Sequence, residues 1–144
     1  MPIVLGPAPP SLFPSVLSFW GVATDIASST DDLPGLAALH ARDPDALLIA
    51  SDDGTIVGSL IVGWDGWRGS FSRLAVLPGH RGRGIGRMLV AEGEARLRRL
   101  GARRVSLFAV VAHKSAMSFW RAVGYEPDPG ELRFVRTLAP EPEG

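Results

Sequence analysis

A run of glycines and arginines near the middle of the chain has the composition of an anion-binding turn. Residues 81–86 read Arg-Gly-Arg-Gly-Ile-Gly, and Arg87 follows at the start of a predicted helix. Glycines at alternate positions let the backbone approach a ligand closely and adopt positive φ. The first N–H groups of a helix have no partner within it and lie at the positive end of its macrodipole. Together with the arginine charges, these features predict a site for a phosphate or pyrophosphate group.

Two familiar phosphate-binding loops do not fit this run. A P-loop requires Lys-Ser/Thr after its last glycine, whereas Arg87-Met88 follows here. A dinucleotide-binding loop requires Gly-x-Gly-x-x-Gly and an acidic residue about 20 positions later, but residues 102–108 contain no carboxylate. A turn that only caps a helix explains one glycine, and not three with arginines between them.

The motif Arg81-x-x-Gly84-x-Gly86 resembles the Arg/Gln-x-x-Gly-x-Gly/Ala signature of the GCN5-related N-acetyltransferases, the GNAT family. A second segment, residues 63–70, leads into Leu74-Ala75-Val76 and resembles the bacterial YpeA-type acetyltransferases within that family. The resemblance implies an α/β (α+β) fold over roughly residues 30–138. Its mixed, mostly antiparallel sheet would have six to seven strands and about four helices, with a splayed pair of parallel strands at the cofactor site.

The resemblance also implies acetyl-coenzyme A as the co-substrate and transfer of its acetyl group to a primary amine of a small molecule or protein. Amides 83–87 would hold the pyrophosphate, and backbone groups of Leu74 and Val76 would pair with the pantetheine arm. The N–H of Val76 is a candidate for polarising the thioester carbonyl. The expected cofactor-binding residues are Leu74, Ala75, Val76, Arg81, Gly82, Arg83, Gly84, Ile85, Gly86, Arg87, His113, Ser115 and Trp120.

The proton transfers that amine acetylation needs have less obvious residues. Many family members carry Asn-x-x-Ala-x-x-Phe-Tyr, whose tyrosine protonates the leaving thiolate, whereas residues 113–120 read His-Lys-Ser-Ala-Met-Ser-Phe-Trp. The indole of Trp120 is not a usable acid, so packing is its expected role. His113 either protonates the thiolate or takes over the pantetheine contact of the missing Asn. Ser115 either caps the following helix or holds a water.

The acceptor side has five candidate residues, each with an ordinary structural alternative. Asp65 is a candidate general base, but Asp-Gly is also a common turn former. Asp25 is the other carboxylate expected on that side. Trp67 and Arg68 are candidates for binding the acceptor, and Trp20 either lines the acceptor pocket or belongs to the core. The alternative function is a non-catalytic acyl-coenzyme A binder of the same fold.

Composition bounds the remaining possibilities. The 144 residues suit one domain, expected over 1–138, with a disordered tail at 139–144. The net charge is zero, yet residues 1–65 carry eight acids and one base while residues 66–144 carry seven acids and fourteen bases. The chain has no cysteine, and therefore no thiolate nucleophile or thiolate metal site. We expect no metal, no nucleic-acid partner, no membrane segment and a cytoplasmic location, and a homodimer stays open.

Hydrophobic periodicity and turn residues predict the elements that position these groups. The expected helices are residues 11–20, 32–42 (capped by Thr30 or Asp31), 85–100 and 115–122. The expected strands are residues 3–5, 46–50, 55–64, 70–76, 104–110 and 131–138. Within the third helix, Gly93 is expected to allow close packing on the sheet, with Ile85, Leu89, Leu97 and Leu100 on its apolar face.

Overall fold

The computed structural model describes residues 2–140 of the chain. Contacts within the chain divide it into two compact units, 1–108 and 109–144. The single domain expected over 1–138 and the disordered tail therefore stay predictions, and tail residues 141–144 lie outside the described part. No helix among the described residues is long and apolar enough to cross a bilayer.

The first unit is built on one five-stranded sheet in the order β1-β2-β3-β4-β5. Its strands are β1 (Ile3–Pro7), β2 (Leu47–Asp52), β3 (Thr55–Trp64), β4 (Gly69–Val76) and β5 (Val105–Leu107). Neighbouring strands are antiparallel except β4 and β5, which run parallel. The mixed sheet that was expected is confirmed.

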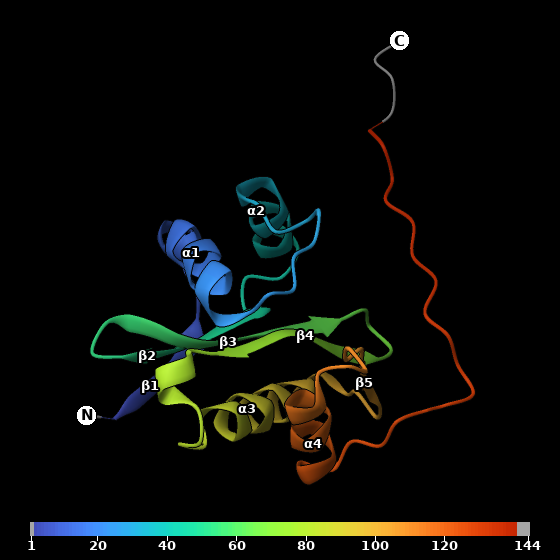
Figure 1. The fold of residues 1–144 in the computed structure, drawn as a ribbon. Coiled ribbons are helices and arrows are strands. Elements are labelled where there is room, and N and C mark those ends of the chain that lie inside the picture. The colour runs from blue at the N-terminus through green and yellow to red at the C-terminus, as the bar shows by residue number, and fades with distance from the viewer. Residues whose placement is uncertain (1, 141–144) are drawn as a thin grey trace. The chain divides into compact units, whose positions relative to one another are not determined.

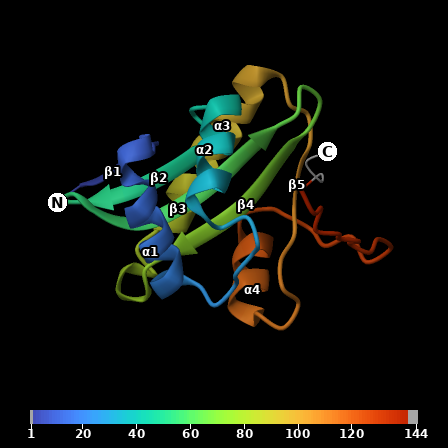
Figure 2. The ribbon, with the colours of Figure 1, turned by 90° about the horizontal axis from the view of Figure 1, so that it is seen from above.

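Helices cover both faces of this sheet. Helices α1 (Phe13–Ala23) and α2 (Leu33–Arg42) lie on one face and α3 (Ile85–Leu100) on the other, as Figures 1 and 2 show. Two short 3-10 turns, η1 (Pro10–Leu12) and η2 (Pro78–His80), precede α1 and the glycine-rich turn. The central strand β3 is consequently buried at six of its ten positions, including five in a row, as expected for a strand covered on both faces.

Helix α3 packs tightly on the sheet because Gly93, in the middle of the helix, has no side chain. A Cβ placed on Gly93 would lie 2.9 Å from Cε1 of Phe71 and 3.1 Å from Cδ2 of Leu60. Ile85, Leu89 and Leu97 are buried on the same face of the helix, as the periodicity predicted. Leu100 is 41% exposed, because it lies in the last turn where the chain leaves the sheet.

The hairpin between β2 and β3 agrees with its sequence. Asp53 and Gly54 have φ of 51° and 81°, the two left-handed positions of a tight hairpin turn. The α2 cap differs from the prediction: Asp32, and not Thr30 or Asp31, caps the helix by accepting the Gly35 N–H at 2.8 Å. Asp31 is unavailable as a cap because its carboxylate is bound by an arginine from β4, described below.

The second unit contains α4 (Lys114–Ala122) and no strand among its described residues. The strand expected at 131–138 is therefore not formed, and the sheet has five strands rather than six or seven. Segment 131–138 contains only four apolar residues among polar and charged ones, and Leu132, Phe134, Val135 and Leu138 are all strongly exposed. Strand β5 is also shorter than the predicted 104–110.

Candidate functional site

The glycine-rich turn between η2 and α3 has the geometry that an anion site needs. Gly82 and Gly84 have φ of 79° and 82°, and a Cβ on either would meet no atom within 4 Å. The backbone of the turn therefore borders open space. An L side chain at either glycine would both strain the backbone and enter that space.

Most amides of this turn have no acceptor among the residues that the structure describes. The N–H of Arg81 donates to Pro78 O at 3.4 Å, and the next amide with a backbone acceptor is that of Met88, which donates to Gly84 O at 3.0 Å. Between them, amides 82–87 have no acceptor in the part of the chain that the structure describes. Their number and their place at a helix N-terminus make this the strongest candidate for holding a phosphate-bearing ligand.

The three arginines beside the turn differ in their contacts. Arg81 donates from Nε to Val76 O at 3.1 Å and from Nη2 to Ala23 O at 3.0 Å, so its side chain ties β4 to the end of α1. Arg83 and Arg87 are exposed, and their side chains form no hydrogen bond or ion pair with the described residues. Their charges remain available to an anion, whereas the guanidinium of Arg81 is engaged in hydrogen bonds to two backbone carbonyls.

The last residues of β4 present an open backbone edge next to this turn. Leu77 N–H donates to Val57 O at 2.9 Å, so Leu77 faces β3. Because backbone groups alternate along an antiparallel strand, Val76 directs its N–H and C=O to the other edge, and Ala75 directs its own toward β3. On that other edge β5 pairs with residues 69–71 only. The strand thus extends beyond its parallel neighbour, and Val76 has an N–H that an extended ligand could use.

The β3–β4 turn, which contains three predicted acceptor-side residues, lies at the opposite end of β4. Gly69 and Val76 are seven residues apart, about 23 Å at the usual rise of an extended strand. The structure therefore does not bring Asp65, Trp67 and Arg68 next to the glycine-rich turn. The Arg68 guanidinium instead stacks on Trp67, with Cζ 3.9 Å from the ring centroid.

Asp65 acts as a turn residue in this structure. Its Oδ1 accepts the N–H groups of Trp67 at 2.8 Å and Arg68 at 2.7 Å. These two hydrogen bonds, first that from Arg68 and then that from Trp67, lower the pKa of the carboxyl below its ordinary value. A carboxylate whose pKa is lowered is a weaker base, which favours the turn role over the catalytic one.

Two other predicted acceptor-side residues lie near the middle of β4. Asp25 is exposed in the loop between α1 and α2. Trp20 is only 5% exposed, and its indole N–H donates to Ser59 Oγ at 2.9 Å. Trp20 therefore belongs to the core and does not line an open pocket, because its ring is covered and its one polar group is satisfied.

The remaining predicted site residues belong to the second unit. His113 is the N-cap of α4 and makes no side-chain cap, while Ser115 lies inside the helix, so the prediction that Ser115 caps it is wrong. Trp120 packs edge-on against Phe119 and Tyr125, with ring centroids 5.2 Å apart in both pairs. This packing agrees with the aromatic packing role expected of Trp120.

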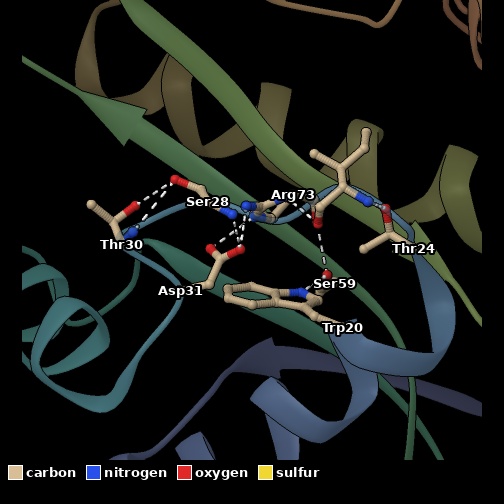
Figure 3. A network of polar contacts seen from close by, with 8 residues as sticks. Trp20, Thr24, Ser28, Thr30, Asp31, Ser59 and Arg73 are labelled. Carbon is tan, nitrogen blue, oxygen red and sulfur yellow. Dashed lines mark hydrogen bonds and ion pairs between the residues drawn. The ribbon is translucent and has the colours of Figure 1, made fainter. Parts of the chain in front are cut away.

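Sequence reasoning missed a polar network that fastens the α1–α2 loop to β4 (Figure 3). Its main members are Trp20, Asp31, Ser59 and Arg73. It also missed the pairing of His80 Nε2 with Asp52 Oδ2 at 3.3 Å, which joins η2 to β2. Neither contact has a local signal, because the partners lie 14 to 42 residues apart in sequence.

Known proteins of similar sequence and fold support the resemblance to the GNAT family. The chain is 28% identical over 131 residues to an acetyltransferase of Sodalis glossinidius, covering 91% of this chain and 92% of that protein. It is 31% identical over 114 residues to an acetyltransferase of Pectobacterium atrosepticum, covering 79% of this chain and 81% of the relative.

Solved structures show the same fold at lower identity. Ard1 from Thermoplasma volcanium matches with a TM-score of 0.77 at 17% identity, over 86% of this chain and 82% of that one. The aminoglycoside N-acetyltransferase AAC(6′)-Iy in complex with CoA matches with a TM-score of 0.73 at 16% identity, over 96% of each chain. The family model described as acetyltransferase (GNAT) family matches residues 14–125. The chain therefore belongs to the GNAT acetyltransferase family.

Proposed function

We propose that this protein is an N-acetyltransferase that transfers the acetyl group of acetyl-coenzyme A to a primary amine by direct attack. The observation that carries the proposal is a run of six amides, 82–87, at a turn whose glycines leave open space; none of these amides has an acceptor among residues 2–140. This turn borders the Val76 N–H, which faces the open edge of β4, so a diphosphate and an extended amide-containing arm could be held side by side.

The turn fits the chemistry of coenzyme A. The amides of residues 82–87 would hold the pyrophosphate, and the charges of Arg83 and Arg87 would add to the attraction. Leu74 and Val76 would pair with the pantetheine arm as with an added strand. Acetyl-coenzyme A supplies an acetyl group activated as a thioester. The bound structure of a neighbour, AAC(6′)-Iy with CoA, supports this class of co-substrate.

One backbone group of the chain would contribute directly to the transfer. The Val76 N–H faces the free edge and would donate to the oxygen on which charge develops, a contribution commonly worth about 3 kcal/mol. Because the chain has no cysteine, no acyl-thiol can form on it and the amine would attack the thioester carbon directly. The N–C bond forms, the C–S bond breaks, and coenzyme A leaves as a thiolate that is protonated to the free thiol. An alkyl ammonium with a pKa of about 10 must lose its proton first, and water is our candidate acceptor since Asp65 is engaged in its turn.

The proposal is tested by calorimetric titration with acetyl-coenzyme A and by release of free thiol in the presence of a panel of amines. We expect saturable binding and amine-dependent thiol release. Binding without release for any amine would favour the alternative, a non-catalytic acyl-coenzyme A binder. That alternative is motivated by Trp120, which stands where many family members have an acidic tyrosine. The acceptor amine, the cytoplasmic location and a homodimer stay predictions.

A further inference from the structure

A β-bulge interrupts β4 three residues before its end. Ser59 pairs with Ala75 and Ile61 pairs with Ser72, so Leu60 of β3 faces two residues of β4, Arg73 and Leu74. Arg73 has φ of 54°, so its backbone adopts the left-handed conformation, which is uncommon for a residue with a long side chain. Such a conformation persists only when neighbouring contacts hold it, and it often marks a functional site.

The backbone of Arg73 is held from below by a buried serine. Ser59 is fully buried, and its hydroxyl donates to the carbonyl oxygen of Arg73 at 2.7 Å. The same hydroxyl accepts the indole N–H of Trp20 at 2.9 Å. The serine therefore satisfies a carbonyl at the bulge and joins it to α1, as Figure 3 shows.

The side chain of Arg73 holds the loop between α1 and α2. Its Nε donates to Asp31 Oδ1 at 3.1 Å, its Nη2 pairs with Oδ2 of the same carboxylate, and its Nη1 donates to Ile26 O at 3.3 Å. Asp31 Oδ2 also accepts the Ser28 N–H at 3.0 Å. The side chains of Arg73 and Asp31 are only 13% and 20% exposed, so solvent screens this pair less than an open surface pair.

We propose that Arg73 is a positioning residue for acetyl transfer, an inference that rests on the proposed function. Its backbone sets the bulge that aims the Leu74–Val76 edge, and its side chain fixes loop 24–31 over the same strand. Arg73 thus holds the strand edge that would face the thioester and the neighbouring loop in a fixed position relative to each other. Arg73 forms no hydrogen bond with the amides 82–87, which would hold the pyrophosphate, so breaking its link should slow transfer much more than it weakens cofactor binding.

The test compares Asp31→Asn with a matched control, Asp43→Asn. Arg96 Nη2 pairs with Asp43 at 2.7 and 2.9 Å and Nη1 reaches Val62 O at 3.4 Å, and these side chains are 17% and 21% exposed. The two ion pairs therefore have the same chemistry and similar burial, but Arg96 lies on α3, away from the bulge. Asp31→Asn keeps the size of the side chain and removes its charge.

For Asp31→Asn we expect kcat to fall about tenfold or more, in line with the cost of small displacements of reacting groups. We expect the dissociation constant of acetyl-coenzyme A to change less than about twofold, and Asp43→Asn to leave both values near wild type. Arg73→Lys should reproduce the loss, and its combination with Asp31→Asn should be less than additive. An unchanged kcat in Asp31→Asn, or an equal loss in Asp43→Asn, would overturn the inference.

Hydrogen–deuterium exchange tests the link without any activity. Asp31→Asn should speed exchange both in loop 24–31 and in residues 73–76 of β4, whereas Asp43→Asn should speed neither. Faster exchange in the loop alone would show that Arg73 does not couple the two segments. A wild type that releases no thiol with any amine would overturn the proposed function instead, and this would be seen before any variant is compared.

Discussion

The Nε of Arg81 donates to the carbonyl oxygen of Val76 at 3.1 Å, at the point where β4 ends. The same guanidinium reaches Ala23 O at the carboxyl end of α1, where a positive charge is favourable. The first arginine of the family motif therefore braces the strand edge beside the glycine-rich turn. We therefore expect Arg83 and Arg87, and not Arg81, to attract an anion directly.

Because Arg81 is hydrogen-bonded and Arg83 is not, we expect alanine substitutions of these two arginines to have different effects. Arg81→Ala removes two hydrogen bonds and should lower the free energy of unfolding by about 1–2 kcal/mol. Arg83→Ala should change stability by less than about 0.5 kcal/mol, because its exposed side chain forms no hydrogen bond or ion pair with the described residues. It should instead weaken acetyl-coenzyme A binding about fivefold at low salt, and less at high salt.

Urea denaturation and calorimetric titration at two salt concentrations check both expectations. The assigned roles would be wrong if Arg81→Ala left the stability unchanged and weakened binding as much as Arg83→Ala, since Arg81 would then act as a direct anion contact.

Local patterns predicted the parts of the fold whose determinants lie close together in sequence. The hairpin at Asp53-Gly54, the long helix α3 and the turn at Gly82 and Gly84 all depend on neighbouring residues, and all are confirmed. The link between Asp31 and Arg73 could not be predicted in this way. It joins residues 42 positions apart and depends on a bulge that no glycine or proline announces.

The same distinction explains which residue caps α2, and the structure also separates the two roles that the sequence allows for Asp65. Any of Thr30, Asp31 and Asp32 has the chemistry of an N-cap, and the tertiary contact to Arg73 decides that Asp31 is used elsewhere. The sequence leaves two roles open for Asp65, a general base on the acceptor side and a turn former. Only the structure shows its carboxylate filled by two amides and its distance from the glycine-rich turn.

Gly84→Ala tests the glycine-rich turn itself. A methyl group at φ of 82° is strained by about 1–2 kcal/mol, and it would project into the space beside the unpaired amides. We expect acetyl-coenzyme A binding to weaken at least about tenfold by titration calorimetry, a loss that corresponds to about 1.4 kcal/mol.

The control is Gly101→Ala at the other end of α3. Gly101 has φ of 101° and also has open space where a Cβ would lie, so its substitution should cost similar stability. Equal weakening of binding by both variants would show that general destabilisation, and not the anion site, is responsible.

Asp65→Asn tests whether this carboxylate is a base or a turn residue. An amide oxygen can still accept the N–H groups of Trp67 and Arg68, so we expect kcat to stay near its wild-type value. A general base would instead lose about a hundredfold or more in kcat on this substitution. Steady-state kinetics at neutral pH separate the two roles.

The lowered pKa of Asp65 also predicts how its contribution to stability depends on pH. A carboxyl whose folded pKa lies below its unfolded value, about 3.9, contributes its full stabilisation above that value. The contribution is lost as the pH falls through the lowered folded pKa. The stability difference between wild type and Asp65→Asn should therefore shrink in acid, and a difference that grew in acid would contradict the assigned cause.

Gly93→Ala and Gly21→Ala should shift stability in opposite directions. A methyl group on Gly93 would press on Phe71 and Leu60, and overpacking of this kind costs about 1–3 kcal/mol. Gly21 lies inside α1 with open space at its Cβ position, so alanine should stabilise the helix by about 0.5–1 kcal/mol. Urea midpoints measure both, and a stabilising Gly93→Ala would show that α3 can move away from the sheet.

His113 can be assigned by replacing it with two residues that separate its possible roles. His113→Ala removes both a pantetheine contact and a proton donor, whereas His113→Asn restores the amide that many family members have at this position. If His113 only contacts the cofactor, alanine should raise KM for acetyl-coenzyme A with little change in kcat, and asparagine should recover the wild-type KM. If His113 protonates the thiolate, both variants should lose kcat and the alkaline limb of the pH profile, because neither side chain can donate that proton. We expect the first pattern, since an asparagine in the same position of related enzymes has no acid to offer.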